Sequence, residues 1–232
     1  NCLSDPCKTI TSEESRFKKG LVYGNVQSGK TAHIASLISM YASAGCKLFI
    51  VLSGVTNNLR QQTQERLRGD LEMDTTGNYD LLTSENDLIG KSLQQIQGKM
   101  LKDCCVIGIF KKNPAALRRL IDYLNNVNDK GFWKEKQVMI IDDECDQYSV
   151  NVKDMSKLKG VDEETGEEFD RSTINKLIVK MMHIFEKYAY VGFTATPFAN
   201  VLNEPPAENS LYPSDFIYPL AMSDKYYGAK KI

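Results

Sequence analysis

The sequence predicts an α/β fold in which a mainly parallel sheet is covered by helices on both faces. Short apolar runs, of the kind found in strands buried on both faces, alternate with longer segments whose apolar residues recur at helical spacing. Repeated alternation of strands and helices is typical of parallel sheets. The chain has 232 residues, 42% of them hydrophobic, so it is long enough to bury the core of one α/β domain.

The predicted elements follow one another regularly. Residues 21–23 form an apolar strand, and residues 47–52 (KLFIVL) form a second strand after a helix that Gly45 is suited to end. The apolar face of that helix consists of Ile34, Leu37, Ile38 and Tyr41. Further strands are expected at residues 104–110, 138–142 and 188–193, and further helices at residues 57–68, 114–126 and 174–185.

Several segments lie outside this alternation. Residues 69–102 form a variable region, and residues 150–171 are polar and acidic, which indicates a surface insertion. Residues 205–232 carry prolines and scattered aromatic side chains, so we expect an extended exit segment rather than another element of the domain. With residues 1–19 as a lead-in, the domain is expected to span residues 20–204.

Composition limits the classes of function. The chain has 29 Lys and Arg against 30 Asp and Glu, a net charge of −1, so any contact with nucleic acid must be local. No apolar run approaches the ~20 residues of a membrane span, and no signal-peptide pattern is present, so we expect a soluble cytoplasmic protein. The six cysteines lack the spacing of zinc or disulfide frameworks and are expected to be reduced and structural.

The glycine-rich segment after the first strand reads GNVQSGKT and matches the P-loop pattern, GxxxxGK followed by Ser or Thr. In this pattern backbone N–H groups surround phosphate oxygens at the positive N-terminal end of a helix. The residues predicted to bind ATP are Gly24, Asn25, Val26, Gln27, Ser28, Gly29, Lys30 and Thr31. Lys30 is expected to reach the β- and γ-phosphates, and the Thr31 hydroxyl to coordinate Mg²⁺.

An acidic cluster follows the strand at residues 138–141. A P-loop needs a strand-end carboxylate for the Mg²⁺ shell and a group that activates water. We assign Asp143 to Mg²⁺ and Glu144 to the water, because DECD at residues 143–146 is a variant of the DEAD-type box. Asp142 remains an alternative strand-end carboxylate, and Asp146 is expected to link the ATP state to neighbouring motifs. A two-metal nuclease centre explains this cluster less well than its pairing with the P-loop does.

The last predicted strand ends in Thr194-Ala195-Thr196-Pro197, which resembles the coupling motif of superfamily two helicases. The Thr194 and Thr196 hydroxyls could bond the acidic box and transmit the nucleotide state to a second domain. The three motifs, in this order, predict a RecA-like P-loop NTPase fold and the first motor domain of a helicase-like ATPase.

The chain also resembles the Z-one domain family of endonucleases, whose helicase-like half carries VQSGKT, IDDEADQ and TATPFAN signatures. Here these read VQSGKT at 26–31, IDDECDQ at 141–147 and TATPFAN at 194–200, with Cys145 in place of alanine. The resemblance covers residues 20–220 and includes LSGVTNNLRQQT at 52–63. It implies an ATP-driven module of a bacterial restriction or phage-defence system, with DNA and defence proteins as partners.

In superfamily two motors the segment after the second strand contacts the nucleic-acid backbone. The resemblance therefore makes Ser53, Gly54, Thr56, Asn57 and Arg60 candidates for phosphate contacts. For Lys111 and Lys112 the same role competes with that of a solvated charge pair.

Such motors place ATP between two similar domains, the second of which supplies arginine fingers. The residues after Asn200 are too few for that domain, so we expect the chain to be part of a longer protein and to hydrolyse ATP poorly alone. Two other functions compete with a DNA translocase. One is a nucleotide-dependent switch that regulates protein partners without moving nucleic acid. The other, a small-molecule kinase, is disfavoured by the TATP sequence.

Overall fold

The computed structural model describes residues 17–24, 29–83, 90–127, 131–134, 136–149, 159–161, 166, 168–202, 206–207 and 209–220. The predicted lead-in therefore lies almost wholly outside the described residues, as do Asn25, Val26, Gln27 and Ser28 of the P-loop and most of the acidic insertion.

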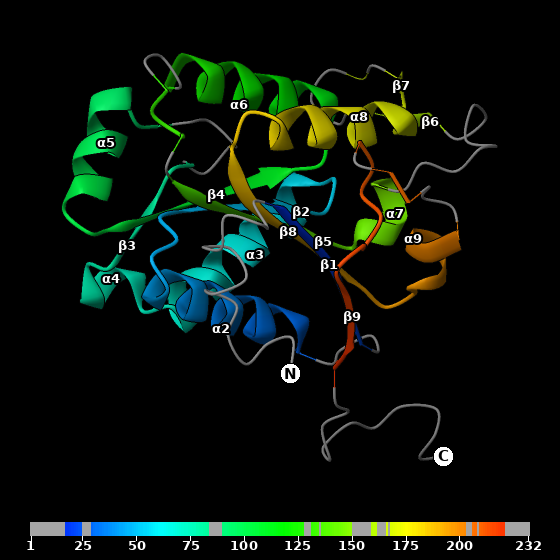
Figure 1. Ribbon diagram of the computed structural model, residues 1–232, viewed down its shortest axis with the longest axis horizontal. Coiled ribbons are helices and arrows are strands. Elements are labelled where there is room, and N and C mark those ends of the chain that lie inside the picture. Colours follow the sequence, from blue (N-terminus) through cyan, green and yellow to red (C-terminus); the bar gives the residue numbers. More distant parts are fainter. Residues whose placement is uncertain are drawn as a thin grey trace.

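A seven-stranded sheet with the order β3-β4-β2-β5-β8-β1-β9 forms the centre of the domain (Figure 1). Every pairing in this sheet is parallel. The strands are β1 (Phe17–Tyr23), β2 (Leu48–Ser53), β3 (Tyr79–Leu81), β4 (Cys105–Lys111), β5 (Gln137–Asp143), β8 (Lys187–Thr194) and β9 (Phe216–Pro219). Because the strands are parallel, their C-terminal ends lie along one edge of the sheet.

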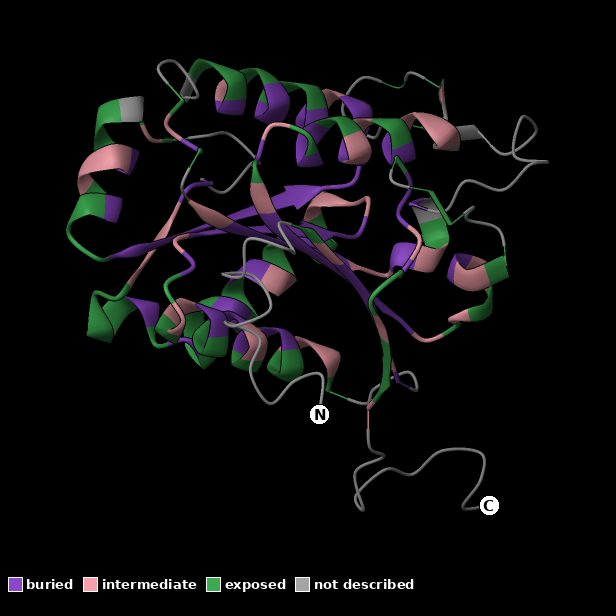
Figure 2. Cartoon of the chain, viewed as in Figure 1, coloured by how far each residue is buried: buried purple, intermediate pink, exposed green. Residues whose placement is uncertain are grey.

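Helices cover both faces of this sheet. One face carries α2 (Lys30–Ser43), α3 (Asn57–Asp70) and α4 (Met73–Thr76), and the other carries α5 (Leu93–Leu101), α6 (Pro114–Val127) and α8 (Arg171–Met182). Side chains of β2 alternate between the two cores, with Leu48, Ile50 and Leu52 in one and Phe49 and Val51 in the other. Figure 2 shows the buried strands between these two layers. The predicted α/β fold is confirmed.

The ends of several helices are fixed by their own sequences. The Thr56 side chain accepts a hydrogen bond from the Leu59 amide at the start of α3, and Asn113 accepts one from the Ala116 amide at the start of α6. Ser92 and Gln95 form a reciprocal capping box at the start of α5. These caps explain why α3 and α6 begin where the sequence predicts, directly after β2 and β4.

Two segments contain more regular structure than the sequence predicts. The variable region holds α4, β3 and α5, and the acidic insertion holds a two-stranded antiparallel pair, β6 (Lys159–Val161) and β7 (Glu168–Asp170). Three-residue strands are too short for a periodic pattern. Within the described residues, no helix is long and apolar enough to cross a membrane.

The exit segment also contributes a strand to the sheet, which corrects the expectation that residues 205–232 add no further element to the domain. Strand β9 pairs in parallel with β1 at the sheet edge. Asp215 accepts a hydrogen bond from the Lys19 amide at 2.9 Å, and the Phe216 ring lies over Gly20, where an added Cβ would come within 2.0 Å of it. The absence of a side chain at Gly20 therefore makes room for this ring.

Candidate nucleotide site

The predicted motifs lie together at the C-terminal edge of the sheet. Gly24 follows β1, Asp143 ends β5 and Thr194 ends β8, and these three strands are neighbours in the order β5-β8-β1. The register pairs Tyr23 with Thr194. The topology alone therefore brings together residues that are up to 170 positions apart in the sequence.

The described part of the P-loop begins and ends in defined contacts. The Gly24 amide donates to the Thr194 carbonyl at 3.0 Å, and the Lys30 ammonium donates to the Gly24 carbonyl at 3.5 Å. Gly29, at the N-cap of α2, has a left-handed backbone with φ of 77°, whereas an added Cβ there would have no atom within 4 Å. Glycine is thus required at this position by backbone conformation rather than by space. Thr31 is partly exposed in the first turn of α2.

Asp142 and Asp143, which compete for the strand-end role, lie in different surroundings. The Asp142 carboxyl is fully buried, accepts a hydrogen bond from the Tyr190 hydroxyl at 2.7 Å and pairs with the Lys112 ammonium at 3.1 Å. Asp143 is only partly buried. Burial raises the pKa of its carboxyl, as does the Glu144 charge, whereas the positive charges of Lys112 and Lys30 lower it. Only β8 separates β5 from β1, so Asp143 and the start of the P-loop lie at the same edge of the sheet, which supports the assignment of Asp143.

Glu144 occupies the turn between β5 and the short helix α7 (Cys145–Tyr148). Its backbone is left-handed, with φ of 52°, a conformation that non-glycine residues rarely adopt. The Glu144 amide donates to the Asp143 carboxylate at 3.1 Å, and its carbonyl accepts from the Gln147 amide at 3.1 Å. The side chain remains partly exposed at the edge of the sheet.

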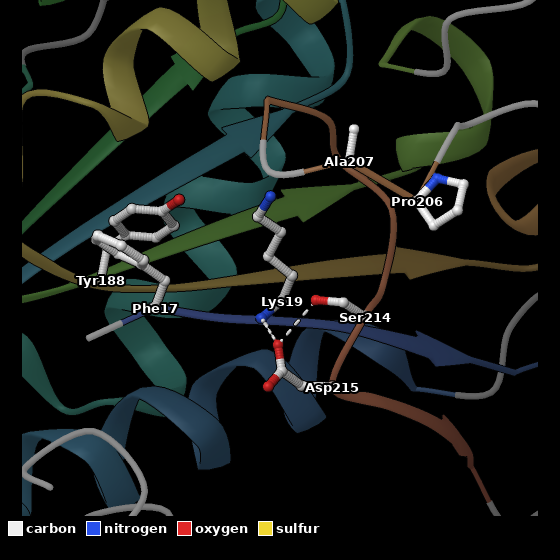
Figure 3. A pocket seen from close by; sticks show the side chains of 7 residues that line it. All are labelled: Phe17, Lys19, Tyr188, Pro206, Ala207, Ser214 and Asp215. Atoms are coloured by element: carbon white, nitrogen blue, oxygen red, sulfur yellow. Dashed lines mark hydrogen bonds between the residues drawn. The ribbon is translucent and has the colours of Figure 1, made fainter. Parts of the chain in front are cut away.

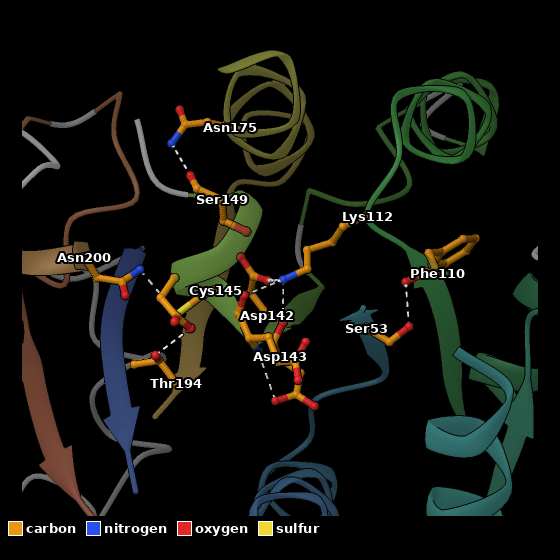
Figure 4. A network of polar contacts seen from close by, with 12 residues as sticks. Ser53, Phe110, Lys112, Asp142, Asp143, Cys145, Ser149, Asn175, Thr194 and Asn200 are labelled. Carbon is orange, nitrogen blue, oxygen red and sulfur yellow. Dashed lines mark hydrogen bonds and ion pairs between the residues drawn. The ribbon is translucent and has the colours of Figure 1, made fainter. Parts of the chain in front are cut away.

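The predicted coupling residues contact one another directly, and Figure 4 shows Thr194 beside the acidic box. The Thr194 hydroxyl donates to one oxygen of the Asp146 carboxylate at 2.6 Å, and the Thr196 hydroxyl donates to the other oxygen. The Thr196 amide donates to the Thr194 hydroxyl at 2.8 Å. Asn200, on helix α9 (Phe198–Leu202), donates to the Cys145 sulfur at 3.3 Å. The end of β8 is therefore bonded to the acidic box at several points.

The residues predicted to contact nucleic acid are mostly buried. Ser53 donates to the Phe110 carbonyl, and Arg60 donates to the Gln64 side chain at 2.8 Å. Lys111 and Lys112 are at most 1% exposed, and Gly54 is also buried. These residues offer no exposed side chain to a phosphate in this structure. Thr56 and Asn57 are partly exposed, so of the residues predicted to contact nucleic acid only those at the start of α3 have accessible side chains.

The contacts of Lys112 with Asp142, and of Tyr190 with Asp142, are not anticipated by the sequence. Lys112 follows β4, and Tyr190 lies in β8. No local pattern signals contacts between residues separated by 30 to 50 positions. The one relevant local signal is the pair Lys111-Lys112 at the end of a buried strand, and both roles predicted for this pair place it at the surface.

A separate cavity of about 330 Å³ lies at the opposite edge of the sheet, where β1 and β8 begin (Figure 3). It is lined by Phe17, Lys19, Tyr188, Pro206, Ala207, Ser214 and Asp215. Lys19 is buried and donates to the Ser210 carbonyl at 2.8 Å. This cavity is therefore distant from the P-loop and is not part of the nucleotide site.

The sheet order, the P-loop position and the strand-end acidic residues define an α/β domain of the RecA-like P-loop type. The chain belongs to the family described as type III restriction enzyme, res subunit, whose model matches residues 6–199. It is therefore a helicase-like ATPase domain. No curated protein matches the chain significantly.

Several solved structures resemble the chain. The helicase domain of Pyrococcus furiosus Hef is 15% identical, with 92% of this chain and 35% of that chain covered and a TM-score of 0.47. Mycoplasma mycoides FtsY is 16% identical, with 62% and 48% covered and a TM-score of 0.29. One chain in the structure of the E. coli MS115-1 HORMA:CdnC:Trip13 complex is 12% identical, with 83% of this chain and 60% of that chain covered and a TM-score of 0.29. The chain spans less than two thirds of the length of each.

Proposed function

We propose that this chain is the ATP-binding domain of a helicase-like translocase that acts on DNA in a restriction or phage-defence system. The observation that carries the proposal is the pair of hydrogen bonds from Thr194 and Thr196 to the Asp146 carboxylate. A protein that only binds nucleotide has no need of such a link between the acidic box and the end of a neighbouring strand. The VQSGKT, IDDECDQ and TATPFAN signatures further support a Z-one domain type within the family.

In this proposal the P-loop residues hold the ATP phosphates, and Thr31 and Asp143 hold Mg²⁺. The residues fit these ligands, because Gly29 presents the first turn of α2 and Asp143 lies within the electrostatic influence of Lys30. Bound Mg²⁺ would neutralise charge on the β- and γ-phosphates. Lys30 binds the same phosphates, and Glu144 orients the attacking water and accepts its proton.

The proposed motor needs more than this chain. A second RecA-like domain would complete the ATP site, so the isolated chain is proposed to hydrolyse ATP poorly. DNA would contact the surface at the start of α3, where Thr56 and Asn57 are partly exposed.

The experiment is an ATPase assay of the full protein with and without single- and double-stranded DNA. Lys30→Ala and Glu144→Gln are expected to abolish a DNA-stimulated activity. Lys176→Ala and Glu186→Gln, which make the same charge changes at exposed positions away from the P-loop and acidic box, are expected to leave it intact. Activity that survives in Lys30→Ala protein would refute the assignment of the site.

A nucleotide-dependent switch that regulates protein partners is the second candidate. It is favoured by the burial of Ser53, Arg60, Lys111 and Lys112 and by the net charge of −1. ATP turnover that is unaffected by any DNA, yet lost in Lys30→Ala and Glu144→Gln proteins, would favour the switch over the translocase.

A further inference from the structure

The ammonium of Lys112 contacts three consecutive residues at the end of β5. It donates to the Asp143 carbonyl, donates to the Glu144 carbonyl at 2.9 Å and forms the ion pair with Asp142 at 3.1 Å. Two of these contacts are hydrogen bonds to backbone carbonyls, and the third balances the charge of the ammonium. Figure 4 shows the Lys112 side chain directed toward Asp142 and Asp143 from the end of β4.

The sheet topology explains why a side chain is needed there. Strand β2 lies between β4 and β5, and its last register pair with β5 joins Leu52 to Asp142. The Asp143 and Glu144 carbonyls therefore lie beyond the β2–β5 ladder. Lys112 follows the last β2–β4 pair, its amide donates to the Gly54 carbonyl at 3.4 Å, and its side chain crosses the end of β2 to reach these carbonyls.

The two carbonyls flank an unfavourable backbone conformation. A left-handed glutamate persists only where surrounding contacts hold it, because a side chain makes this backbone conformation unfavourable. At Glu144 those contacts are Lys112 on its carbonyl, Gln147 on the same carbonyl and the Asp143 carboxylate on its amide. The Tyr190 hydroxyl in turn holds the second oxygen of Asp142.

We propose that Lys112 is a positioning residue for ATP hydrolysis, whose ammonium fixes the backbone of Asp143 and Glu144 and thereby the direction of the Glu144 carboxylate. The inference rests on the proposed function, in which Glu144 orients the attacking water. Lys112 itself touches neither the water nor the phosphates. Its role differs from the phosphate contact predicted from the sequence, because a fully buried ammonium that faces β5 has no surface left for DNA.

The test compares the full protein with a Lys112→Met/Asp142→Asn double variant. Removing both charges of a buried pair avoids an unpaired buried carboxylate, so the double variant is expected to fold. Lys112→Gln/Asp142→Asn is measured in the same way in case the first variant does not fold. The matched control is Lys18→Met/Asp215→Asn, which removes a 2.7 Å ion pair at the opposite edge of the sheet.

Four quantities are measured for each protein: the affinity for a fluorescent ATP analogue, kcat, KM and the rate of amide hydrogen exchange in residues 142–148. The double variant is expected to bind nucleotide within threefold of wild type, whereas its kcat falls at least tenfold. A displacement of a catalytic group by about 1 Å can cost on the order of 100-fold in rate. Exchange at the Gln147 amide is expected to accelerate at least tenfold. The control should change neither kcat nor this exchange rate.

Two results would overturn the inference. One is a folded double variant with kcat within twofold of wild type, and the other is unchanged exchange in residues 142–148. The exchange measurement needs no hydrolysis, so it judges the Lys112 contacts even if wild-type protein turns over no ATP. Failure of the proposed function is seen separately: the wild-type protein and the Lys30→Ala variant would then bind nucleotide with the same affinity.

Discussion

Replacing Lys112 alone by methionine should be among the most destabilising substitutions in this domain. Lys112 and Asp142 are both 0% exposed, so the single variant leaves a buried carboxylate without its cation and two carbonyls without a donor. Breaking a buried pair from one side costs about 3–5 kcal/mol. In a domain of this size, 1 kcal/mol corresponds to about 2–4 °C, so the melting temperature should fall by roughly 6–20 °C.

Urea unfolding, followed through the fluorescence of the single tryptophan, Trp133, measures this loss. Trp133 is 1% exposed in the core that contains α6 and α8, so its emission reports global unfolding. In a double-mutant cycle, adding Asp142→Asn should recover most of the stability. The exposed pair Arg68 and Asp74 should show no resolvable coupling. A Lys112→Met variant that loses less than about 1 kcal/mol, or a double variant no more stable than the single one, would refute the reasoning.

Three further predictions concern Asp143, two glycines and the buried cysteines. Because burial raises the Asp143 pKa, the contribution of this carboxyl to stability is fully present below its ordinary pKa of 3.8 and is lost as pH rises through the folded value. Without Mg²⁺, the Asp143→Asn variant should therefore have a higher melting temperature than wild type at pH 7, and the difference should shrink toward pH 3.8. Equal melting temperatures at pH 7 would contradict this prediction. Gly192→Ala should lower the free energy of urea unfolding by about 1–3 kcal/mol, because the added Cβ would lie 2.8 Å from the Cys145 sulfur. Gly98→Ala in α5 is the control: its Cβ meets no atom within 4 Å, so this variant should be more stable than wild type. Burial also raises the thiol pKa values of the four free cysteines in the described residues, so a thiol reagent should label them only after unfolding; rapid labelling of native protein would contradict this. These are Cys46, Cys104, Cys105 and Cys145.

Most of the fold could be predicted because its signals are local. The continuous apolar run of β2 and the spacing of Ile34 and Ile38 in α2 depend on residues within one element. Strand β9 could not be predicted in this way, because it has four residues, three of them exposed, and a proline. Its place at the edge depends on a long-range fit between the Phe216 ring and Gly20.

The candidate site likewise contains contacts that local signals predict and contacts that depend on long-range packing. Gly24, Asp143 and Thr194 could be placed together because each follows a buried strand and parallel strands share one C-terminal edge. The burial of Lys112 could not be anticipated, since a lysine after a strand is normally solvated. Only the β4-β2-β5 order shows that its side chain crosses the end of β2 to an acidic partner.

Thr194 contacts both the P-loop and the acidic box of the proposed ATP site, and it does so through different atoms. Its carbonyl accepts from the Gly24 amide, while its hydroxyl donates to Asp146 and accepts from the Thr196 amide. The first contact depends only on the backbone and persists with any side chain, whereas the second requires a hydroxyl. In the proposed motor, the position of Gly24, at the start of the P-loop, is therefore fixed by the sheet itself. Communication between the acidic box and the residues after β8 depends instead on side chains that can change partners when ATP is hydrolysed.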